Sequence, residues 1–155
     1  MPINKTEAIV LRRRDFRETS LIVDFYTRDF GRISGILKGI RLDPGKFAST
    51  VEVSSYNEII FYNKASSALH LVSACDLKDK FFNIRGSVSK AAISAFMMEL
   101  LLAVMQPEDK NEEIFNLALM ALKELEWTNN PDKISTIFKI KMLSLSGFRP
   151  HFDSC

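Results

Sequence analysis

Residues 7–41 read EAIVLRRRDFRETSLIVDFYTRDFGRISGILKGIR, and this stretch decides the fold class. Aliphatic and β-branched side chains fill its beginning, a composition typical of a β-strand. In the run 21–27 a period of two places Leu21, Val23 and Phe25 on one face and Asp24 on the other, which indicates a strand. The turn signal Asp29-Phe-Gly follows, and a third strand begins at Arg32. The stretch therefore predicts consecutive β-strands joined by short turns.

The strand pattern continues beyond this stretch. Gly35 and Gly39 interrupt the third strand and suit the bends that close a small barrel. Asp43-Pro-Gly forms a loop, and two further apolar runs follow at 51–62 and 69–74. Short strands with turn signals roughly every 8–12 residues favour a barrel or a sandwich over a parallel sheet. We therefore expect five strands in residues 1–80.

After Asp76 the pattern changes to that of helices. Ser87 or Ser89 is the expected N-cap of a helix that runs to Met105 and is stopped by Pro107. Because this helix is apolar nearly all the way round, we expect it to be buried on most sides.

Two more helices complete the chain. Apolar residues at three- and four-residue steps predict a helix over 112–127. Asn130-Pro-Asp is a helix start, and Gly147 is the expected end of that helix. The fold class is thus α+β with an all-β part before an all-α part: five strands of a barrel or a sandwich in residues 1–80 and an α-helical domain in residues 81–155.

The composition excludes several classes of protein. Of 155 residues, 46% are hydrophobic and 26% charged, as in ordinary soluble proteins. No apolar run reaches the roughly 20 residues that a membrane span requires. A signal peptide is not expected either, because Glu7 and the arginines of 12–14 lie too close together. Cys75 and Cys155 provide no disulfide framework, so we expect a cytoplasmic protein.

Positive charge is concentrated in the first third of the chain. Residues 1–50 contain ten Lys or Arg and six Asp or Glu, whereas residues 51–130 contain seven and eleven. Basic residues follow two predicted strands and their exits, where a barrel would bring them to one edge along a phosphodiester backbone. The alternative is that they are solvated strand ends. The candidate nucleic-acid-binding residues are Arg12, Arg13, Arg14, Arg17, Arg32, Lys38, Arg41 and Lys46.

Aromatic residues lie near these basic groups. Tyr26, Phe30 and Phe47 are candidate stacking faces for bases, with the alternative that they belong to the core.

The sequence offers little for catalysis. The histidines, His70 and His151, lie in no nucleophile motif, and no phosphate-binding loop or dinucleotide fingerprint is present. Cys75 is interpreted as a small core residue. We expect a protein that is not an enzyme and that needs no cofactor.

The order of the motifs resembles one family. An Arg-rich strand end is followed by R-E-T (17–19), then T-R-x-x-G-R (27–32), then K-G-x-R (38–41). The segment LSGFRPHFDSC (145–155) is also similar to that family's approach to a zinc-binding region. These features resemble the bacterial DNA repair and recombination protein RecO.

The resemblance implies a fold and a function. It implies an N-terminal OB-fold, then a helical domain, in a nucleoid-associated protein that binds single- and double-stranded DNA and anneals complementary strands. It also implies partnership with RecR and with single-stranded-DNA-binding protein in loading RecA. Lys38, Arg41 and Arg12–Arg14 fall where the family's basic OB-fold residues are expected. The alternative is a protein-only adaptor in which the barrel is a structural platform.

The chain also departs from the family pattern. Family members are generally longer and carry further cysteines beyond the position of Cys155, so we expect a truncated chain. Four ligands are needed for a closed zinc site, whereas His151 and Cys155 provide at most two. We therefore expect no structural zinc and a mobile tail after Gly147. The loop after K-G-x-R contains an acid, Asp43, which weakens its expected contact with DNA.

The last predicted helix is the candidate protein-binding site. The family's single-stranded-DNA-binding protein has an acidic tail with an apolar aromatic end, which needs an apolar pocket rimmed by cations. The candidate residues are Lys133, Ile137, Phe138, Lys139 and Lys141, and the alternative is that these lysines merely solvate a surface helix.

Overall fold

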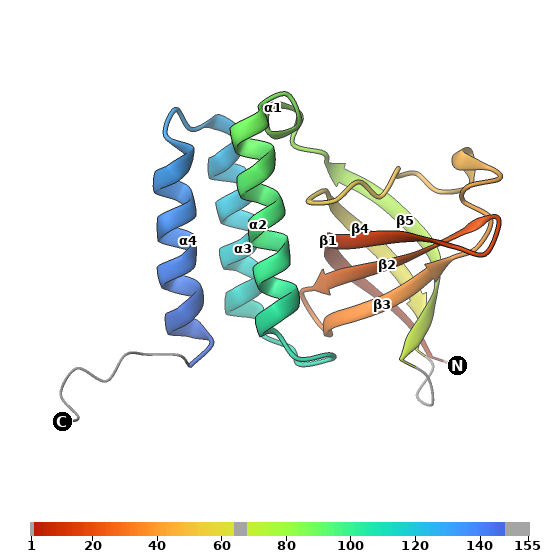
Figure 1. Cartoon of the computed structure of the whole chain (residues 1–155). Coiled ribbons are helices and arrows are strands. Elements are labelled where there is room, and N and C mark those ends of the chain that lie inside the picture. Colours follow the sequence, from red (N-terminus) through yellow and green to blue (C-terminus); the bar gives the residue numbers. More distant parts are fainter. Residues whose placement is uncertain (1, 64–67, 148–155) are drawn as a thin grey trace.

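A closed five-stranded barrel forms the first half of the protein (Figure 1). The computed structural model describes residues 2–63 and 68–147. Neighbouring strands follow the order β1-β2-β3-β5-β4, with β4 returning to β1. This is the strand order of an OB-fold, so the expected fold is confirmed. The strands are β1 (Ile3–Phe16), β2 (Ser20–Thr27), β3 (Gly31–Leu37), β4 (Tyr56–Tyr62) and β5 (Leu69–Asp79).

The long strand β1 closes the barrel because it pairs on both sides. Ala8 lies opposite Thr27 of β2 and opposite Asn57 of β4, both in antiparallel ladders. The ladder of β1 and β2 shifts register between Val10 and Arg12, a bulge that bends the strand. Strands β3 and β5 form the parallel pair. The inward side chains fill the barrel with a core that includes Val10, Val23, Phe25, Ile59, Phe61 and Cys75.

Within the described part of the chain, four helices follow the barrel. Side chains cap three of them, since Ser87, Asn111 and Asn130 each accept a hydrogen bond from the backbone N–H three residues later. Pro131 occupies the first helical position of the last helix. The helices are α1 (Phe82–Arg85), α2 (Val88–Val104), α3 (Glu112–Trp127) and α4 (Pro131–Leu145).

The barrel and the helices share one apolar core. Ile9, Leu11 and Tyr26 point away from the barrel interior and pack with residues of α2, α3 and α4. The ring of Tyr26 lies 6.3 Å from that of Phe115 on α3. In addition, the Arg28 guanidinium lies 4.5 Å from the centroid of the same Phe115 ring. The outer side of β1 and β2 is therefore divided between helix packing and solvent.

The turn at Gly31 brings the helices close to the start of β3. Gly31 has a φ of +69°, and a Cβ there would lie 2.5 Å from the backbone oxygen of Asp109. The carbonyl of Arg32 accepts a hydrogen bond from the N–H of Glu108 at 2.8 Å. The segment between α2 and α3 is thus fixed against the barrel by backbone contacts.

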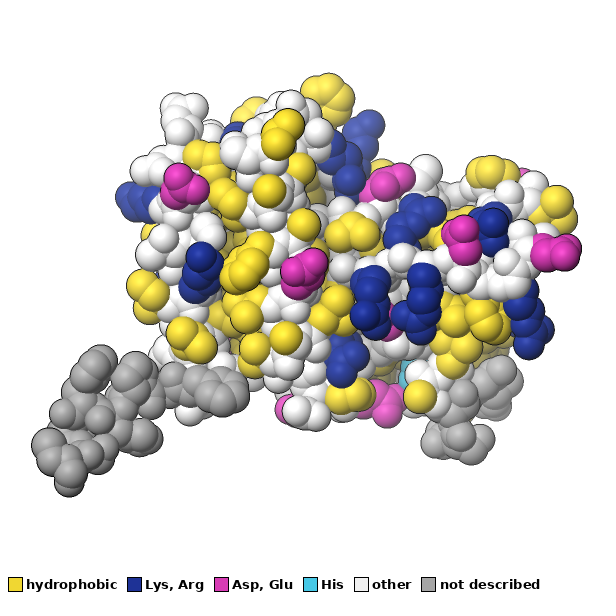
Figure 2. Space-filling view, viewed as in Figure 1, with side chains coloured by type: hydrophobic (Ala, Val, Ile, Leu, Met, Phe, Trp, Pro, Cys, Tyr) yellow, Lys and Arg dark blue, Asp and Glu magenta, His cyan; other side chains and the backbone are white. Residues whose placement is uncertain are grey.

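Three sequence expectations need correction. Strand β5 continues to Asp79 beyond the expected change to helix, and the short helix α1 was not expected. Helix α2 is not buried on most sides, because Val88 is 90% and Phe96 41% exposed. Its buried residues face the barrel, α3 and α4, and hydrophobic side chains show on its outer surface (Figure 2).

Among the helices of the described residues, we find none with the length and apolar character needed to cross a membrane.

Candidate nucleic-acid interface

Two arginines of β1 lie together on the solvent-facing side of the barrel. Arg12 and Arg14 both approach the carboxylate of Asp24 on β2, at 2.7 Å and 3.6 Å. Asp24 is 1% exposed and also accepts a hydrogen bond from the hydroxyl of Ser34. Both arginine side chains remain about half exposed, at 55% and 52%. A buried carboxylate therefore holds two cations at the surface.

Lysine and arginine side chains gather over β1, β2 and β3 on the face that Figure 2 shows. The arginines of β1 are divided between two sides because side chains alternate along a strand: Arg12 and Arg14 point to one side and Arg13 to the other. A row of half-exposed cations on a barrel surface fits the regularly spaced charges of a nucleic-acid backbone.

Arg13 has a different role in the structure. It donates a hydrogen bond to the carbonyl of Thr50 at 2.8 Å and lies 3.8 Å from Glu52. It therefore holds the irregular segment before β4 and is separated from Arg12 and Arg14 by the pleat of β1.

The loop cations form a second group at one end of the barrel. Arg41 donates to the carbonyl of Arg17 at 3.1 Å and pairs with Asp15 at 3.5 Å. Lys46 donates to the carbonyl of Lys38 at 2.7 Å. The structure thus brings the β1–β2 turn and the segment after β3 together. Four of the predicted site residues lie in this group: Arg17, Lys38, Arg41 and Lys46.

Arg32 lies at the other end of β3 from Lys38. Its side chain is half-buried and donates to the carbonyl of Met105 at 3.1 Å, at the end of α2. It therefore connects the barrel to the helices, and the structure does not bring it into the loop group.

The expected stacking aromatics are mostly core residues. Tyr26 is 0% and Phe47 7% exposed, so the interpretation of these two rings as stacking faces is wrong. Both rings belong to apolar cores, where large apolar side chains are more often found than on the surface. Phe30 is half-buried and meets Phe61 edge to face at 5.3 Å.

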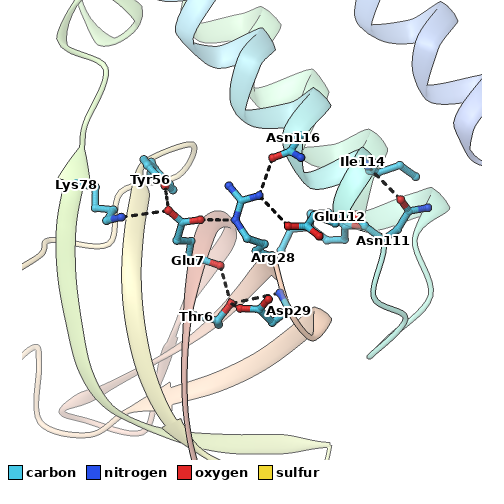
Figure 3. A network of polar contacts seen from close by, with 11 residues as sticks. Thr6, Glu7, Arg28, Asp29, Tyr56, Lys78, Asn111, Glu112, Ile114 and Asn116 are labelled. Atoms are coloured by element: carbon cyan, nitrogen blue, oxygen red, sulfur yellow. Dashed lines mark hydrogen bonds and ion pairs between the residues drawn. The ribbon is translucent and has the colours of Figure 1, made fainter.

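A network of polar contacts fixes the position of the barrel relative to the helices (Figure 3). Glu7 on β1 accepts hydrogen bonds from Arg28, Tyr56 and Lys78. Arg28 continues to α3, where it donates to Asn116 at 2.7 Å. Burial alone would raise the pKa of Glu7, but the hydrogen bonds from Tyr56, Arg28 and Lys78 outweigh it and lower the pKa to about 2. Glu7 is therefore ionised at neutral pH.

The residues with catalytic potential are occupied in other ways. Burial raises the pKa of the Cys75 thiol to about 12, as expected for a core cysteine and not for a nucleophile. His70 is 1% exposed and lies 2.9 Å from Glu108. Within residues 2–63 and 68–147, no three His, Cys, Asp or Glu side chains are grouped as a metal site would require. His151 and Cys155, and hence the expectations of a mobile tail and no zinc, lie outside the described residues.

The candidate protein-binding residues of α4 do not share one surface. Ile137, Phe138 and Lys141 line a small groove of about 50 Å³ between α3 and α4. Phe138 is 1% exposed and forms the base of this groove. Lys139 points elsewhere and lies 4.9 Å from the ring of Phe96 on α2. Lys133 is an exposed residue of the first turn.

Sequence reasoning missed the residues that organise these surfaces. Asp24 breaks the apolar pattern of β2, and that break is the available signal for its role beside Arg12 and Arg14. The contacts of Glu7 had no such signal, because its partners come from separate parts of the chain.

Two models of known protein families match this chain, one over each of its two parts. The model "Recombination protein O N terminal" matches residues 1–81, and the model "Recombination protein O C terminal" matches residues 85–155.

Curated relatives agree with these matches. The DNA repair protein RecO of Chlorobium phaeobacteroides is 34% identical over 154 residues, which cover 99% of this chain and 59% of the relative. That of Alkaliphilus metalliredigens is 31% identical over 97% of this chain and 61% of the relative. That of Caldicellulosiruptor saccharolyticus is 30% identical over 100% of this chain and 63% of the relative. The chain thus spans about three-fifths of the length of these relatives. Because the two family models together match nearly all of it, the chain belongs to the RecO family.

Proposed function

We propose that this chain is the DNA-holding part of a recombination mediator. The observation that carries the proposal is the pair Arg12 and Arg14, held half-exposed on the outer side of an OB barrel by the buried Asp24. OB barrels bind single strands along such charged surfaces, with contacts from the loops at the barrel ends. The loop group of Arg17, Lys38, Arg41 and Lys46 lies at one such end.

Strand annealing needs no catalytic side chain in this proposal. Cations that neutralise the phosphates of two strands lower their mutual repulsion, and base pairing then supplies the favourable free energy. The same surface would hold single- and double-stranded DNA. From the family, we further propose that the protein acts in the bacterial cytoplasm, on the nucleoid, and helps RecR to load RecA onto strands covered by single-stranded-DNA-binding protein.

Salt dependence tests whether the loop group contacts phosphates. With about five contacts to a single strand, log K should fall with log salt at a slope near −3.5. The double variant Lys38→Ala with Arg41→Ala should bind about tenfold more weakly at physiological salt, for all DNA sequences alike, with a slope near −2. Fluorescence anisotropy of a labelled oligonucleotide measures both quantities.

An unchanged slope in the double variant would show that neither side chain contacts a phosphate. If the unaltered chain binds no DNA at physiological salt, the protein-only adaptor replaces this proposal.

Removal of the Asp24 charge should strengthen DNA binding. Asp24→Asn keeps the shape of the side chain but leaves Arg12 and Arg14 without their carboxylate partner. The gain should be about fourfold at physiological salt, the effect of about one extra phosphate contact. Glu113→Gln, an equal charge change on the exposed surface of α3, is the control and should change the affinity much less. An affinity equal to that of the control would contradict the assigned surface, because neither the charge of Asp24 nor its contacts with the two arginines would then affect DNA binding.

The groove between α3 and α4 is the proposed site for the tail of single-stranded-DNA-binding protein. Ile137 and Phe138 provide the apolar floor, Lys141 provides the cation, and Glu124 is a carboxylate that also lines the groove. An acidic peptide that ends in an aromatic residue should bind about threefold more weakly when Lys141 is changed to Ala. Lys123→Ala, on the exposed face of α3, is the matched control. Equal affinity for the peptide with a free and with an amidated C-terminus would argue against a cation-rimmed groove.

A further inference from the structure

A second cavity lies where the barrel meets the helices, at the junction of β5 and α1. Its volume is about 240 Å³. Apolar side chains form most of its walls, and Lys80 and Arg85 stand exposed beside it. The lining residues that matter here are Ser54, Phe81, Ala91 and Ala95.

Ser54 gives this cavity a polar group without a partner. The side chain is buried, at 4% exposure, and lines the cavity. Its hydroxyl is the buried side-chain oxygen that has no hydrogen-bond partner among the described residues. Because an unsatisfied buried hydroxyl costs free energy, rotation of this side chain toward a hydrogen-bonding group placed in the cavity would be favourable.

The surroundings favour a nucleotide as that ligand. Phe82 is 71% exposed, and the ammonium of Lys80 lies 5.7 Å from the centroid of its ring. Exposed aromatic rings next to cations are the usual surface for unstacked bases and their phosphates. The nearby carboxylates are already engaged, since Asp79 accepts from the N–H of Phe81 and Glu52 pairs with Arg13.

The cavity is also connected to the side of β1 on which Arg13 lies. Arg13 donates to the carbonyl of Thr50, and Arg85 donates to the carbonyl of Val53 at 2.9 Å. The segment between them leads from the side of β1 to the cavity mouth. Lysine and arginine side chains accordingly continue from the barrel face to the region beside α1 (Figure 2).

We propose that this cavity takes one unstacked base of a single strand, with Lys80 and Arg85 at the adjacent phosphate. The proposal rests on the proposed DNA binding and extends its path beyond the barrel. The base would occupy the apolar cavity, and the buried Ser54 hydroxyl would reach its edge after rotation of the side chain.

Filling the cavity tests the proposal. Ala95 is an exposed residue of α2 that lines the cavity, so Ala95→Leu adds bulk there without disturbing the core. Ala103→Leu is the matched control, since Ala103 is exposed on the same helix and does not line the cavity. The probes are a short oligothymidylate and an abasic oligonucleotide of equal length, which carry the same charge and differ only in their bases.

The readout is the ratio of the affinities for the two probes. Ala95→Leu should lower this ratio about tenfold by excluding one base, and leave binding of the abasic probe unchanged. Ala103→Leu should leave the ratio unchanged. Ala91→Leu, which fills the same cavity one helical turn earlier, should repeat the result.

The two proposals fail differently. If the unaltered chain binds neither probe, the proposed DNA binding is overturned. If it binds both, and both filling variants keep the ratio while their melting temperatures match that of the control, the cavity proposal alone is overturned.

Discussion

Replacing Glu7 by glutamine should lower the free energy of unfolding by about 2 kcal/mol at neutral pH. The carboxylate accepts hydrogen bonds from Arg28, Tyr56 and Lys78, and these hold its pKa near 2 instead of 4.5. Each pH unit of this difference corresponds to at most about 1.4 kcal/mol, and the expected loss is smaller than the full sum because solvent still reaches the carboxylate and screens its charge. Urea unfolding at pH 7 measures the loss, and Glu113→Gln on the surface of α3 is the control, with an expected loss under about 1 kcal/mol.

The sign of the pH dependence follows from the lowered pKa. The folded state binds the Glu7 proton less readily than the unfolded state, so its contribution is complete above pH 4.5 and is lost as the pH falls towards about 2. Glu7→Gln should therefore remove part of the acid sensitivity of the protein in this window. If the variant and the unaltered chain lose stability in parallel between these pH values, Glu7 does not have the assigned role.

Replacing Gly31 by alanine should be at least as damaging, with an expected loss of about 3 kcal/mol or more. The left-handed backbone, with its φ of +69°, accounts for about 1–2 kcal/mol in a residue with a Cβ. The rest comes from contact of that Cβ with the backbone of Asp109, whose atoms would lie 2.5–2.7 Å away. Backbone atoms cannot rotate out of the way as a flexible side chain can.

Gly39 provides the control for this prediction. Its φ is +79°, but the nearest atom to an added Cβ would be the flexible end of Lys46, at 3.5 Å. Gly39→Ala should therefore show the backbone cost alone. Equal losses for the two substitutions, measured by urea unfolding, would mean that the contact with Asp109 has no energetic effect.

Local patterns predicted most elements of the fold. The period of two marked β2, and N-cap residues such as Ser87 and Asn130 marked the starts of helices. The end of β5 was not predicted because residues 76–79 are mostly polar and exposed. Their strand geometry comes from pairing with β4. Cross-strand pairing adds backbone hydrogen bonds that a side-chain pattern does not record.

The candidate site was predictable to a smaller extent. The clustering of Arg12–Arg14 in the sequence located the basic surface, but the pleat of β1 then separates Arg13 from its neighbours. The role of Arg32 could not be predicted from local patterns, because its contact with Met105 joins residues more than 70 positions apart. Which basic residues contact DNA stays a prediction.

The strand pairing described for β1 has a consequence for synthesis of the chain. One edge of β1 pairs with residues 56–62, which are made much later than β1 itself. Until β4 leaves the ribosome, the three-stranded meander of β1, β2 and β3 has an open edge of unpaired amides and carbonyls. Such edges recruit other strands and promote aggregation, and closing them by distant contacts slows folding. We therefore expect the nascent barrel to depend on chaperones until β4 and β5 emerge.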